Sequence, residues 1–562
     1  MQAARNLLTA LCALGLKWLV LCPGSRSAPL AMAAGQLAQL GELELITAID
    51  ERSAAFLALG LATAEGHGVA VVTTSGTAVA NLLPAAVEAD RSAQPLLLLT
   101  ADRPERLKNC GANQTVNQEE FLVSVCRCFR SGCTDGIHHQ NADQLQALVG
   151  EIWEQAHGTA HAAPGPVQLN LPFEEPLHPS ADDQTNLNAA PVLRNRKLAE
   201  ASAPAVSPPQ LDPHQPGLVV AGPWRGLTQD LPAYQQAVHR WMLATGWPLL
   251  ADPLAALAQG CPGRLDHWEL QLDALPVPKD CQVLRLGPMP ASRRLEACLQ
   301  AHQGPQLLIS EGEPRSLDPL GVATQWCGGM ARWCEAQALP SPPLDRGWCA
   351  PAGDPATMLA SALPLQGAVS EPALAYWLPQ LLPAQLPVML ASSSPVRDWL
   401  AWGGQAASHR RCFGFRGASG IDGTLSLAMG LALASGPLVL VTGDLALLHD
   451  SNGWLHATPE GPPLLVVLID NRGGGIFQQL PIASVQFEQL FAMPQRVDPL
   501  ALAAAHGVQG RQVACLEDLP QALDWGLAQA RPALLRLCTD RTRDAELRLT
   551  LRAAAQNEQP IS

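Results

Sequence analysis

Short apolar runs alternate with longer alanine- and leucine-rich stretches along most of this chain. Each run ends in a polar or glycine-bearing loop, and a helical pattern follows the loop. This alternation is typical of α/β folds with parallel sheets, whose loops gather at one edge of the sheet. The runs predict strands at residues 18–22, 43–48, 69–73, 96–100, 167–171, 218–221, 282–286, 306–310, 388–390, 438–442, 464–470 and 533–538.

Two proline-rich segments without periodicity divide this pattern into three blocks. Such segments are typical of connections between domains. The chain therefore predicts an α/β protein with three doubly wound parallel-sheet domains. The expected parts are a first domain at 1–180, a linker at 181–216, a central domain at 217–338, a second linker at 339–356, a third domain at 357–540 and a C-terminal tail at 541–562, interpreted as a surface helix with a frayed end.

Composition narrows the range of partners and compartments. With 562 residues and 48% hydrophobic side chains, the chain can bury several cores. Its formal charge of −14 and pI near 5.4 argue against nucleic-acid and anionic-membrane partners, so a cationic site must be assembled from local side chains. The 15 cysteines include no CxxC pair, which favours free thiols in the reducing cytoplasm.

One cluster of cysteines and histidines contains the residue types that bind zinc. Cys126, Cys128 and Cys133 lie close to His138 and His139 in the sequence. Their spacing matches no common zinc-ligand pattern. We therefore assign no metal to this cluster.

Two apolar stretches are long enough to suggest membrane contact, but both are interrupted. Lys17 ends the first stretch, and no small-residue cleavage site follows it, so an amphipathic helix is expected there instead of a signal peptide. The uncharged stretch 423–443 contains Ser435-Gly436-Pro437, which splits it into a helix and a strand. The sequence therefore predicts no membrane span.

Two of the predicted strands end on oxygen-bearing side chains. The run 438–442 leads into Gly443-Asp444, and the run 464–470 leads into Asn471. Since parallel strands end at the same edge of a sheet, these groups are expected to meet. A carboxylate from Asp444, an amide oxygen from Asn471 and a backbone carbonyl from Gly473 would suit Mg²⁺ or Mn²⁺ with phosphate oxygens. By itself the pattern also fits two core strands that end in ordinary turns.

The spacing of 27 positions (471 − 444) resembles the diphosphate motif of thiamine-diphosphate enzymes. Leu445 and Arg472 stand where that motif usually carries a second Gly and a second Asn. Three similar α/β blocks also resemble the pyrimidine-binding, central and diphosphate-binding domains of the thiamine-diphosphate decarboxylase superfamily. The resemblance implies the thiamine-diphosphate-binding fold, with thiamine diphosphate and a divalent cation as cofactors.

In that superfamily the first domain supplies a glutamate, and Glu51 is the candidate here. It follows the predicted strand 43–48 and opens a helical stretch. The resemblance implies that its carboxyl group bonds to the cofactor's aminopyrimidine ring and promotes activation of the thiazolium carbon. The alternative is an acidic residue that merely complements the helix dipole.

Several further motifs resemble the family of 2-succinyl-5-enolpyruvyl-6-hydroxy-3-cyclohexene-1-carboxylate synthases over nearly the whole chain. They are Cys22-Pro23-Gly24-Ser25-Arg26-Ser27, Thr74-Ser75-Gly76-Thr77, Thr100-Ala101-Asp102-Arg103-Pro104, Cys110-Gly111-Ala112-Asn113-Gln114, Arg416-Gly417-Ala418-Ser419-Gly420-Ile421-Asp422-Gly423 and Gly475-Ile476-Phe477. The family's substrates, 2-oxoglutarate and isochorismate, each carry two carboxylates. Recurrent arginines in predicted loops suit such substrates because guanidinium groups pair with carboxylates.

The resemblance assigns the remaining site residues. Those expected at the cofactor are Glu51, Ser419, Ile421, Gly443, Asp444, Leu445, Asn471, Gly473, Ile476 and Phe477, with Asp444, Asn471 and Gly473 also expected at the metal. Arg397 and Arg416 are expected to hold the oxoglutarate-derived chain. Expected around isochorismate are Ser25, Arg26, Arg103, Gln114, Arg293, Arg294 and Ser393, with Ile476, Phe477 and Leu480 as an apolar wall.

The implied reaction is decarboxylation of 2-oxoglutarate followed by conjugate addition of the succinyl unit to isochorismate, in menaquinone or phylloquinone synthesis. The resemblance also implies a homodimer, or a dimer of dimers, in which two chains share each cofactor. Two alternatives remain at this point. One is a thiamine enzyme for a smaller keto acid, such as a pyruvate decarboxylase or acetolactate synthase, and the other is an inactive cofactor-binding regulatory subunit.

Overall fold

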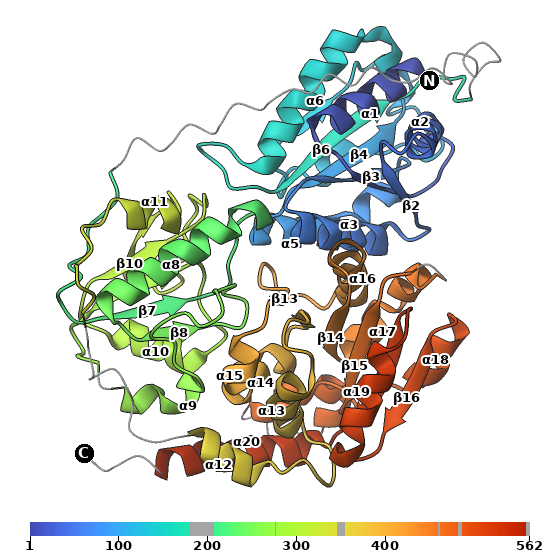
Figure 1. Cartoon of the computed structure of the whole chain (residues 1–562). Helices are drawn as coiled ribbons and strands as arrows, with labels where there is room; N and C mark the ends of the chain where they lie inside the picture. Colours follow the sequence, from blue (N-terminus) through green and yellow to red (C-terminus); the bar gives the residue numbers. More distant parts are fainter. Residues whose placement is uncertain (179–206, 276, 345–354, 459–460, 481–485, 558–562) are drawn as a thin grey trace.

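The computed structural model describes residues 1–178, 207–275, 277–344, 355–458, 461–480 and 486–557. These residues form three α/β domains, each built on a parallel sheet (Figure 1). The predicted fold class is therefore confirmed. Parts of the two predicted linkers, 181–206 and 345–354, lie outside the described residues.

The first domain has a sheet of strand order β2-β1-β3-β4-β6-β5. Helices lie on both sides of it, so β3 and β4 are buried at every position and carry continuous apolar sequence. The strands are β1 (Trp18–Leu21), β2 (Glu44–Thr47), β3 (Val69–Thr73), β4 (Leu96–Asp102), β5 (Phe129–Ser131) and β6 (Pro166–Pro172). The helices are α1 (Gln2–Leu14), α2 (Ala28–Gln39), α3 (Glu51–Glu65), α4 (Thr77–Ala80), α5 (Leu83–Ser92) and α6 (Ala142–His157).

The central domain has a five-stranded sheet of order β11-β10-β9-β7-β8. Its core is rich in tryptophan, and the rings of Trp241 and Trp333 meet edge-on with centroids 4.7 Å apart. The strands are β7 (Gly217–Ala221), β8 (Leu249–Ala251), β9 (Gln282–Leu286), β10 (Gln306–Ile309) and β11 (Ala323–Trp326). The helices are α8 (Leu231–Thr245), α9 (Trp268–Gln271), α10 (Arg293–Ala301) and α11 (Met330–Glu335).

The third domain repeats the strand arrangement of the first, with the order β13-β12-β14-β15-β17-β16. Its strands are β12 (Val388–Leu390), β13 (Cys412–Gly414), β14 (Leu438–Gly443), β15 (Leu464–Asp470), β16 (Gln509–Val513) and β17 (Ala533–Cys538). Its helices are α12 (Pro355–Ala362), α13 (Glu371–Leu381), α14 (Ser394–Trp402), α15 (Gly404–Ser408), α16 (Thr424–Ser435), α17 (Asp444–His449), α18 (Pro499–Ala505), α19 (Leu519–Leu527) and α20 (Arg541–Asn557).

All twelve predicted strands are present, with ends shifted by two residues at most. The sequence did not reveal β5, β8, β11, β13 and β16. Each of these five strands lies at the edge of its sheet, and three of them are only three residues long. Edge strands need no long apolar run because only one side of the strand is paired, so periodicity does not reveal them.

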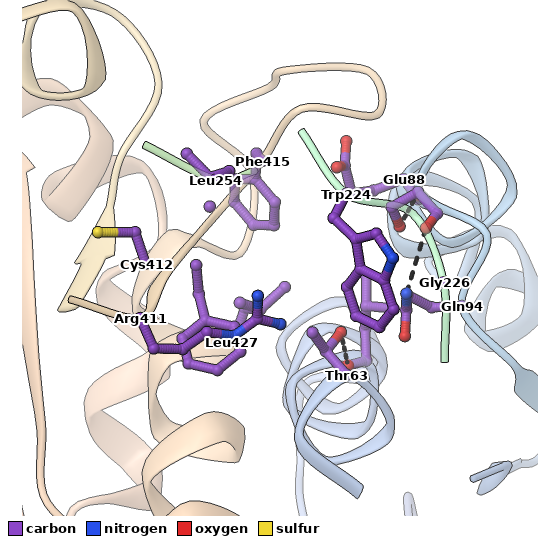
Figure 2. Close-up of a pocket in the computed structure, with 14 residues that line it drawn as sticks. Thr63, Glu88, Gln94, Trp224, Gly226, Leu254, Arg411, Cys412, Phe415 and Leu427 are labelled. Atoms are coloured by element: carbon purple, nitrogen blue, oxygen red, sulfur yellow. Dashed lines mark hydrogen bonds between the residues drawn. The ribbon is translucent and has the colours of Figure 1, made fainter. Parts of the chain in front are cut away.

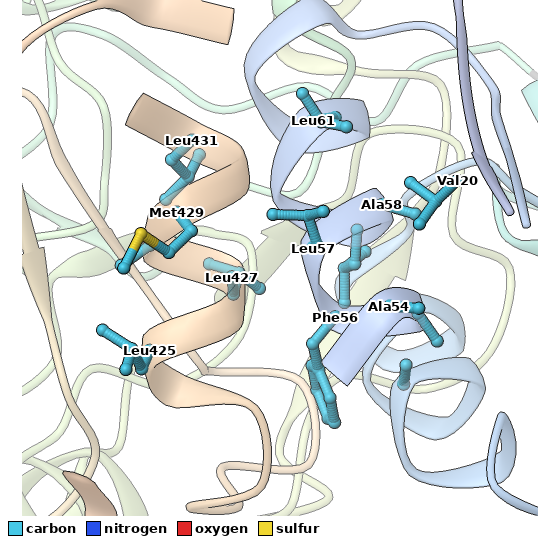
Figure 3. Close-up of a cluster of buried hydrophobic side chains, with 14 of the residues drawn as sticks. Val20, Ala54, Phe56, Leu57, Ala58, Leu61, Leu425, Leu427, Met429 and Leu431 are labelled. Atoms are coloured by element: carbon cyan, nitrogen blue, oxygen red, sulfur yellow. The ribbon is translucent and has the colours of Figure 1, made fainter. Parts of the chain in front are cut away.

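The first and third domains pack through α3 and α16, whose side chains belong to one hydrophobic core (Figure 3). Glycines allow the two backbones to approach closely. A Cβ atom at Gly60 would lie 2.2 Å from the carbonyl oxygen of Leu427, and a Cβ atom at Gly430 would lie 2.1 Å from that of Leu57. The helix pair therefore fixes the two domains relative to each other within the chain.

Both apolar stretches fold as predicted. Helix α1 buries one face, which includes Leu7, Leu8 and Leu11. The stretch 423–443 forms α16 and β14. Among the residues that the structure describes, no helix is long and apolar enough to cross a membrane.

The C-terminal tail forms a helix at the surface, α20, and one face of this helix is buried. Asp544 and Arg548 are buried, and α20 contacts α12, α13 and α9 along the base of the third domain (Figure 1). The polar sequence of α20 suggested exposure. Groups far away in the sequence stabilise the buried polar residues: Arg548 forms ion pairs with Glu371 and Asp398, and Asp544 accepts a hydrogen bond from the Glu371 N–H.

Candidate active site

A cavity of about 410 Å³ lies where loops leave the carboxyl ends of β12, β13, β14 and β15. Ligands in α/β folds bind at this edge of the sheet. Twelve of the predicted site residues line it, namely Ser393, Arg397, Arg416, Ser419, Ile421, Gly443, Asp444, Leu445, Asn471, Gly473, Ile476 and Phe477. The described part of the first domain contributes no lining residue.

Asp444 links the ends of the two central strands. Its Oδ1 accepts a hydrogen bond from the Leu445 N–H (2.8 Å), and its Oδ2 accepts one from the Gly473 N–H (2.7 Å). Burial raises the pKa of Asp444 to about 6, despite these hydrogen bonds. A cation beside this carboxylate would favour its charged form.

Asn471 presents an unsatisfied acceptor. Its Nδ2 donates to Glu371 Oε1 at 2.7 Å, which fixes the orientation of the amide. Its Oδ1 is then buried without a hydrogen-bond partner. Gly473 has φ of +115°, and a Cβ there would lie 1.8 Å from the Ala492 carbonyl oxygen, so only glycine fits. A carboxylate, an orphaned amide oxygen and a glycine backbone form a hard oxygen ligand set, which fits Mg²⁺ or Mn²⁺.

Side chains that the sequence analysis missed hold Asn471 in place. Arg548 of α20 donates to Glu371 Oε2 at 2.6 Å and also pairs with Asp398. Arg541, two turns earlier on the same face of α20, donates to the Asn471 carbonyl oxygen at 3.1 Å. No motif connects these residues, because only the fold brings α13, α14 and α20 together.

Two arginines, Arg397 and Arg416, also line the cavity. Partial burial lowers the pKa of Arg397, and the nearby Arg416 and Arg293 lower it further. The Arg416 Nε is buried without a hydrogen-bond partner. A fully buried carboxyl group, Asp252, lies near Arg416 and Arg397 and accepts hydrogen bonds from two backbone N–H groups. An anionic ligand could satisfy the free guanidinium donors.

Ser393 holds Arg397 in this group. The Arg397 Nη1 donates to the Ser393 carbonyl oxygen at 2.7 Å. Ser393 itself has φ of +76°, an unusual conformation for serine at the start of α14. Strained backbone of this kind is concentrated at functional sites.

Seven predicted substrate residues lie outside the cavity lining, and three of them, Arg293, Arg294 and Leu480, belong to the central and third domains. Arg293 is the exposed first residue of α10 and lies near Arg397. Arg294 turns to the central domain, where it donates to Asp273 Oδ2 at 2.6 Å and lies 3.8 Å from Glu269. Leu480 is 38% exposed, beyond the lining formed by Ile476 and Phe477. Their assignment to isochorismate stays a prediction.

The remaining predicted substrate residues form a second cationic group in the first domain. Arg103 donates to the Gln114 carbonyl oxygen at 2.7 Å, and Gln114 donates to the Ser75 carbonyl oxygen at 2.9 Å. Burial and the neighbouring Arg26 lower the pKa of Arg103. Arg26 donates to a backbone carbonyl, whereas its Nε is buried without a partner. Ser25 precedes it and is exposed.

Glu51 is the first residue of α3, and Asp50 caps that helix by accepting the N–H of Arg52 at 2.9 Å. The Glu51 carboxylate accepts a long hydrogen bond of 3.4 Å from Asn81. It does not line the cavity around Asp444. Within one chain, the predicted pyrimidine end and diphosphate end of the site are therefore not brought into one cavity.

The cysteines and histidines of the 126–139 cluster, all described by the structure, do not gather into a metal-binding group. Among the described residues, no group of three or more His, Cys, Asp or Glu side chains is arranged to hold a metal ion. Burial raises the pKa of Cys128 to about 11, so its thiol is protonated at neutral pH. The oxygen site at Asp444 and Asn471 is not of that type, because an amide and a backbone carbonyl take part.

The fold matches solved thiamine enzymes. A benzoylformate decarboxylase from Polynucleobacter necessarius superposes with a TM-score of 0.68 at 16% identity, covering 96% of this chain and 98% of that chain. A thiamine diphosphate-dependent 4-hydroxybenzoylformate decarboxylase from Rhodococcus jostii RHA1 gives 0.69 at 15% identity, covering 96% of this chain and 99% of that chain. At such low identity these matches show the fold alone.

Comparisons of the sequence with protein families and related proteins are more specific than the fold matches. Residues 1–121 match the family described as thiamine pyrophosphate enzyme, N-terminal TPP binding domain, and residues 399–537 match its C-terminal TPP binding domain. A protein of Parasynechococcus marenigrum (strain WH8102), named 2-succinyl-5-enolpyruvyl-6-hydroxy-3-cyclohexene-1-carboxylate synthase, is 68% identical over 97% of this chain and 99% of its own length. A protein of Synechococcus sp. (strain CC9605) with the same name is 69% identical over 99% of both chains. The chain therefore belongs to the 2-succinyl-5-enolpyruvyl-6-hydroxy-3-cyclohexene-1-carboxylate synthase family of thiamine pyrophosphate enzymes.

Proposed function

We propose that this protein decarboxylates 2-oxoglutarate and adds the resulting succinyl unit to isochorismate, with thiamine diphosphate and Mg²⁺ or Mn²⁺ as cofactors. The product is 2-succinyl-5-enolpyruvyl-6-hydroxy-3-cyclohexene-1-carboxylate, an intermediate on the route to menaquinone or phylloquinone. One observation supports this most strongly. A single cavity combines the hard oxygen ligands Asp444 and Asn471 with the arginines Arg397 and Arg416.

The residues divide the work along the cavity. Asp444, Asn471 and the Gly473 backbone would hold the cation, and Ser419, Gly443 and Leu445 would surround the diphosphate end. Bound thiamine diphosphate supplies a nucleophilic carbon and an electron sink for the decarboxylation. Ile421, Ile476 and Phe477 give the reacting centre an apolar wall that excludes water.

Glu51 would place its carboxyl group against the ring end of the cofactor and hold a proton at the ring nitrogen. Its alternative role, a charge that complements the dipole of α3, needs no such contact. Asp50 already caps α3 and places a carboxylate at its N-terminus. A second acid is therefore not required for helix stability.

The arginines would hold the two dicarboxylate substrates. Arg397 and Arg416 lie in the cavity and suit the carboxylates of the succinyl chain. Arg103 and Arg26 form the separate cationic group of the first domain and suit isochorismate. The protein is acidic overall, yet the Nε atoms of Arg416 and Arg26 are buried without a hydrogen-bond partner in the two cationic groups. Anionic ligands would supply the missing partners.

We also infer that the working enzyme is a homodimer, alone or as a dimer of dimers. The first-domain group with Glu51 and the third-domain cavity are both incomplete within one chain. A two-fold pairing that places each first domain over the partner's cavity gives two equivalent sites. Exposed apolar side chains in both domains, including Ile49 (78%) in the first and Leu490 (55%) in the third, suit such a contact. The free thiols of the described cysteines suit the cytoplasm.

Turnover tests the proposal. Purified protein with thiamine diphosphate and Mg²⁺ receives either 2-oxoglutarate or pyruvate, each with and without isochorismate. We expect rapid CO₂ release only from 2-oxoglutarate with isochorismate, and one adduct per CO₂. Release from pyruvate at an equal rate would indicate another keto-acid enzyme. No release from any mixture, despite cofactor binding, would indicate a regulatory subunit.

A further inference from the structure

The loop that carries Arg416 and Ser419 into the cavity is held from behind by a carboxylate of another domain. Glu88, on α5 of the first domain, accepts hydrogen bonds from three consecutive backbone N–H groups of this loop. The distances are 2.8 Å from Gly417, 2.6 Å from Ala418 and 3.3 Å from Ser419. The Glu88 side chain is 4% exposed.

From this geometry we propose that Glu88 is a positioning residue, which fixes the Arg416 loop and thereby the guanidinium group that binds the 2-oxoglutarate-derived carboxylate. The inference rests on the proposed function for the identity of that ligand. The contact itself does not depend on it. Hydrogen bonds to an ionised acceptor are stronger than those between neutral groups, and here three of them converge on one carboxylate.

The fit of the loop on Glu88 is tight. A Cβ atom at Gly417 would lie 2.7 Å from Glu88 Oε1 and 2.9 Å from its carboxyl carbon. Glycine therefore allows the loop backbone to lie directly on the carboxylate. Ser419 continues the loop with φ of +61°, a conformation that its surroundings must stabilise.

The central domain holds the same loop at its first residue. Arg225 donates from Nη2 to the Arg416 carbonyl oxygen at 2.6 Å. Its positive charge also favours the ionised form of Glu88, against the burial that raises the pKa of that carboxyl group. Figure 2 shows Glu88 next to Trp224 of the central domain, across a small cavity from Phe415 and Arg411 of the third. Three domains thus meet at the loop.

The opposite side of the loop faces the substrate cavity. Arg416, Ser419 and Ile421 line that cavity, and the Arg416 Nε is buried without a partner. Glu88 does not line that cavity, but it lines the small cavity behind the loop. A shift of the loop away from Glu88 would move the Arg416 guanidinium group without removing any group that touches a ligand.

Two variants test the proposal, one in the first domain and one in the third. Glu88→Gln replaces one acceptor oxygen by an NH₂ group that confronts the loop N–H groups, and Gly417→Ala pushes the loop off an intact Glu88. For both we expect the KM for 2-oxoglutarate to rise about tenfold or more, because a charge-assisted contact of Arg416 is misplaced. The KM for isochorismate should change less than about twofold. Glu154→Gln, on the exposed face of α6, is the matched control and should leave both KM values unchanged.

A second readout is independent of the substrates. Hydrogen exchange of the segment 416–420 should be faster in Glu88→Gln than in wild type, while α16 stays protected. Unchanged exchange would overturn the proposal. So would a lower kcat with both KM values unchanged, since that is the result of a purely structural role. If wild-type protein shows no turnover with 2-oxoglutarate and isochorismate, the proposed function fails, whereas the exchange result still decides the role of Glu88.

Discussion

Replacing Arg548 of α20 by methionine should damage both stability and cofactor binding. Arg548 is 5% exposed and forms the only ion pairs that the structure records for Glu371 and Asp398, whose side chains are 1% and 8% exposed. Methionine keeps much of the volume but removes the charge. Two buried carboxyl groups then face each other without a cation.

The expected loss of stability is large. Breaking a buried ion pair by removing one partner costs about 3–5 kcal/mol. For a domain of roughly 200 residues, each kcal/mol lowers the Tm by about 2–4 °C, so the third domain should melt roughly 10 °C earlier. Cofactor binding should weaken because Glu371 loses its ion-pair partner. The Glu371 carboxylate then fixes the orientation of the Asn471 amide less firmly. If the misoriented Asn471 oxygen contributes about 1.4 kcal/mol less to cofactor binding, the affinity for thiamine diphosphate falls about tenfold.

Two assays and one matched variant separate these effects. Thermal unfolding gives the Tm, and calorimetric titration of thiamine diphosphate at fixed Mg²⁺, well below the Tm, gives the affinity. Arg543→Met changes the same residue type on an exposed position of the same helix and should leave both values unchanged. Wild-type affinity in Arg548→Met, together with a lowered Tm, would refute the claim that α20 positions Asn471.

Four further substitutions test the assigned roles. Glu51→Gln should retain the fold and cofactor binding but lose about 10²–10⁴-fold in rate, since an amide cannot protonate the ring nitrogen, and full activity would reject the assignment. Asp444→Asn should weaken thiamine diphosphate binding at fixed Mg²⁺ in a calorimetric titration, because the buried diphosphate loses a bridged cation, and an unchanged affinity would place the metal elsewhere. Arg416→Ala should raise the KM for 2-oxoglutarate and Arg103→Ala that for isochorismate, each about 10–150-fold, and equal effects on both substrates would reject this division.

The fold could be predicted from sequence wherever burial leaves a regular pattern. Central strands such as β3, β9 and β15 begin and end where the apolar runs do, because helices cover them on both faces. Five of the six edge strands and the buried face of α20 could not be predicted. Their stability depends on pairing with segments far away in the sequence, as Arg548 does with Glu371, and no local pattern records that.

The site also contains residues that the sequence could predict and residues that it could not. Residues that follow strands, such as Asp444 and Asn471, meet in one cavity because the topology of a parallel sheet brings strand ends together. The position of Arg294 depends on a side-chain rotamer and on local acids, which a motif does not specify. Glu88 could not be found either. It lies within a helix, and only the packing of three domains brings it to the loop.

The central claim is that each site combines Glu51 of one chain with the Asp444 cavity of another. Mixing inactive Glu51→Gln protein with inactive Asp444→Asn protein, under conditions that allow subunit exchange, tests it most directly. A mixed dimer then contains one site with both substitutions and one intact site, so a fraction of wild-type activity should return, up to about one quarter in an equal mixture if subunits pair at random. If mass measurements show exchange and no activity returns, each site belongs to a single chain and the shared-site account is contradicted.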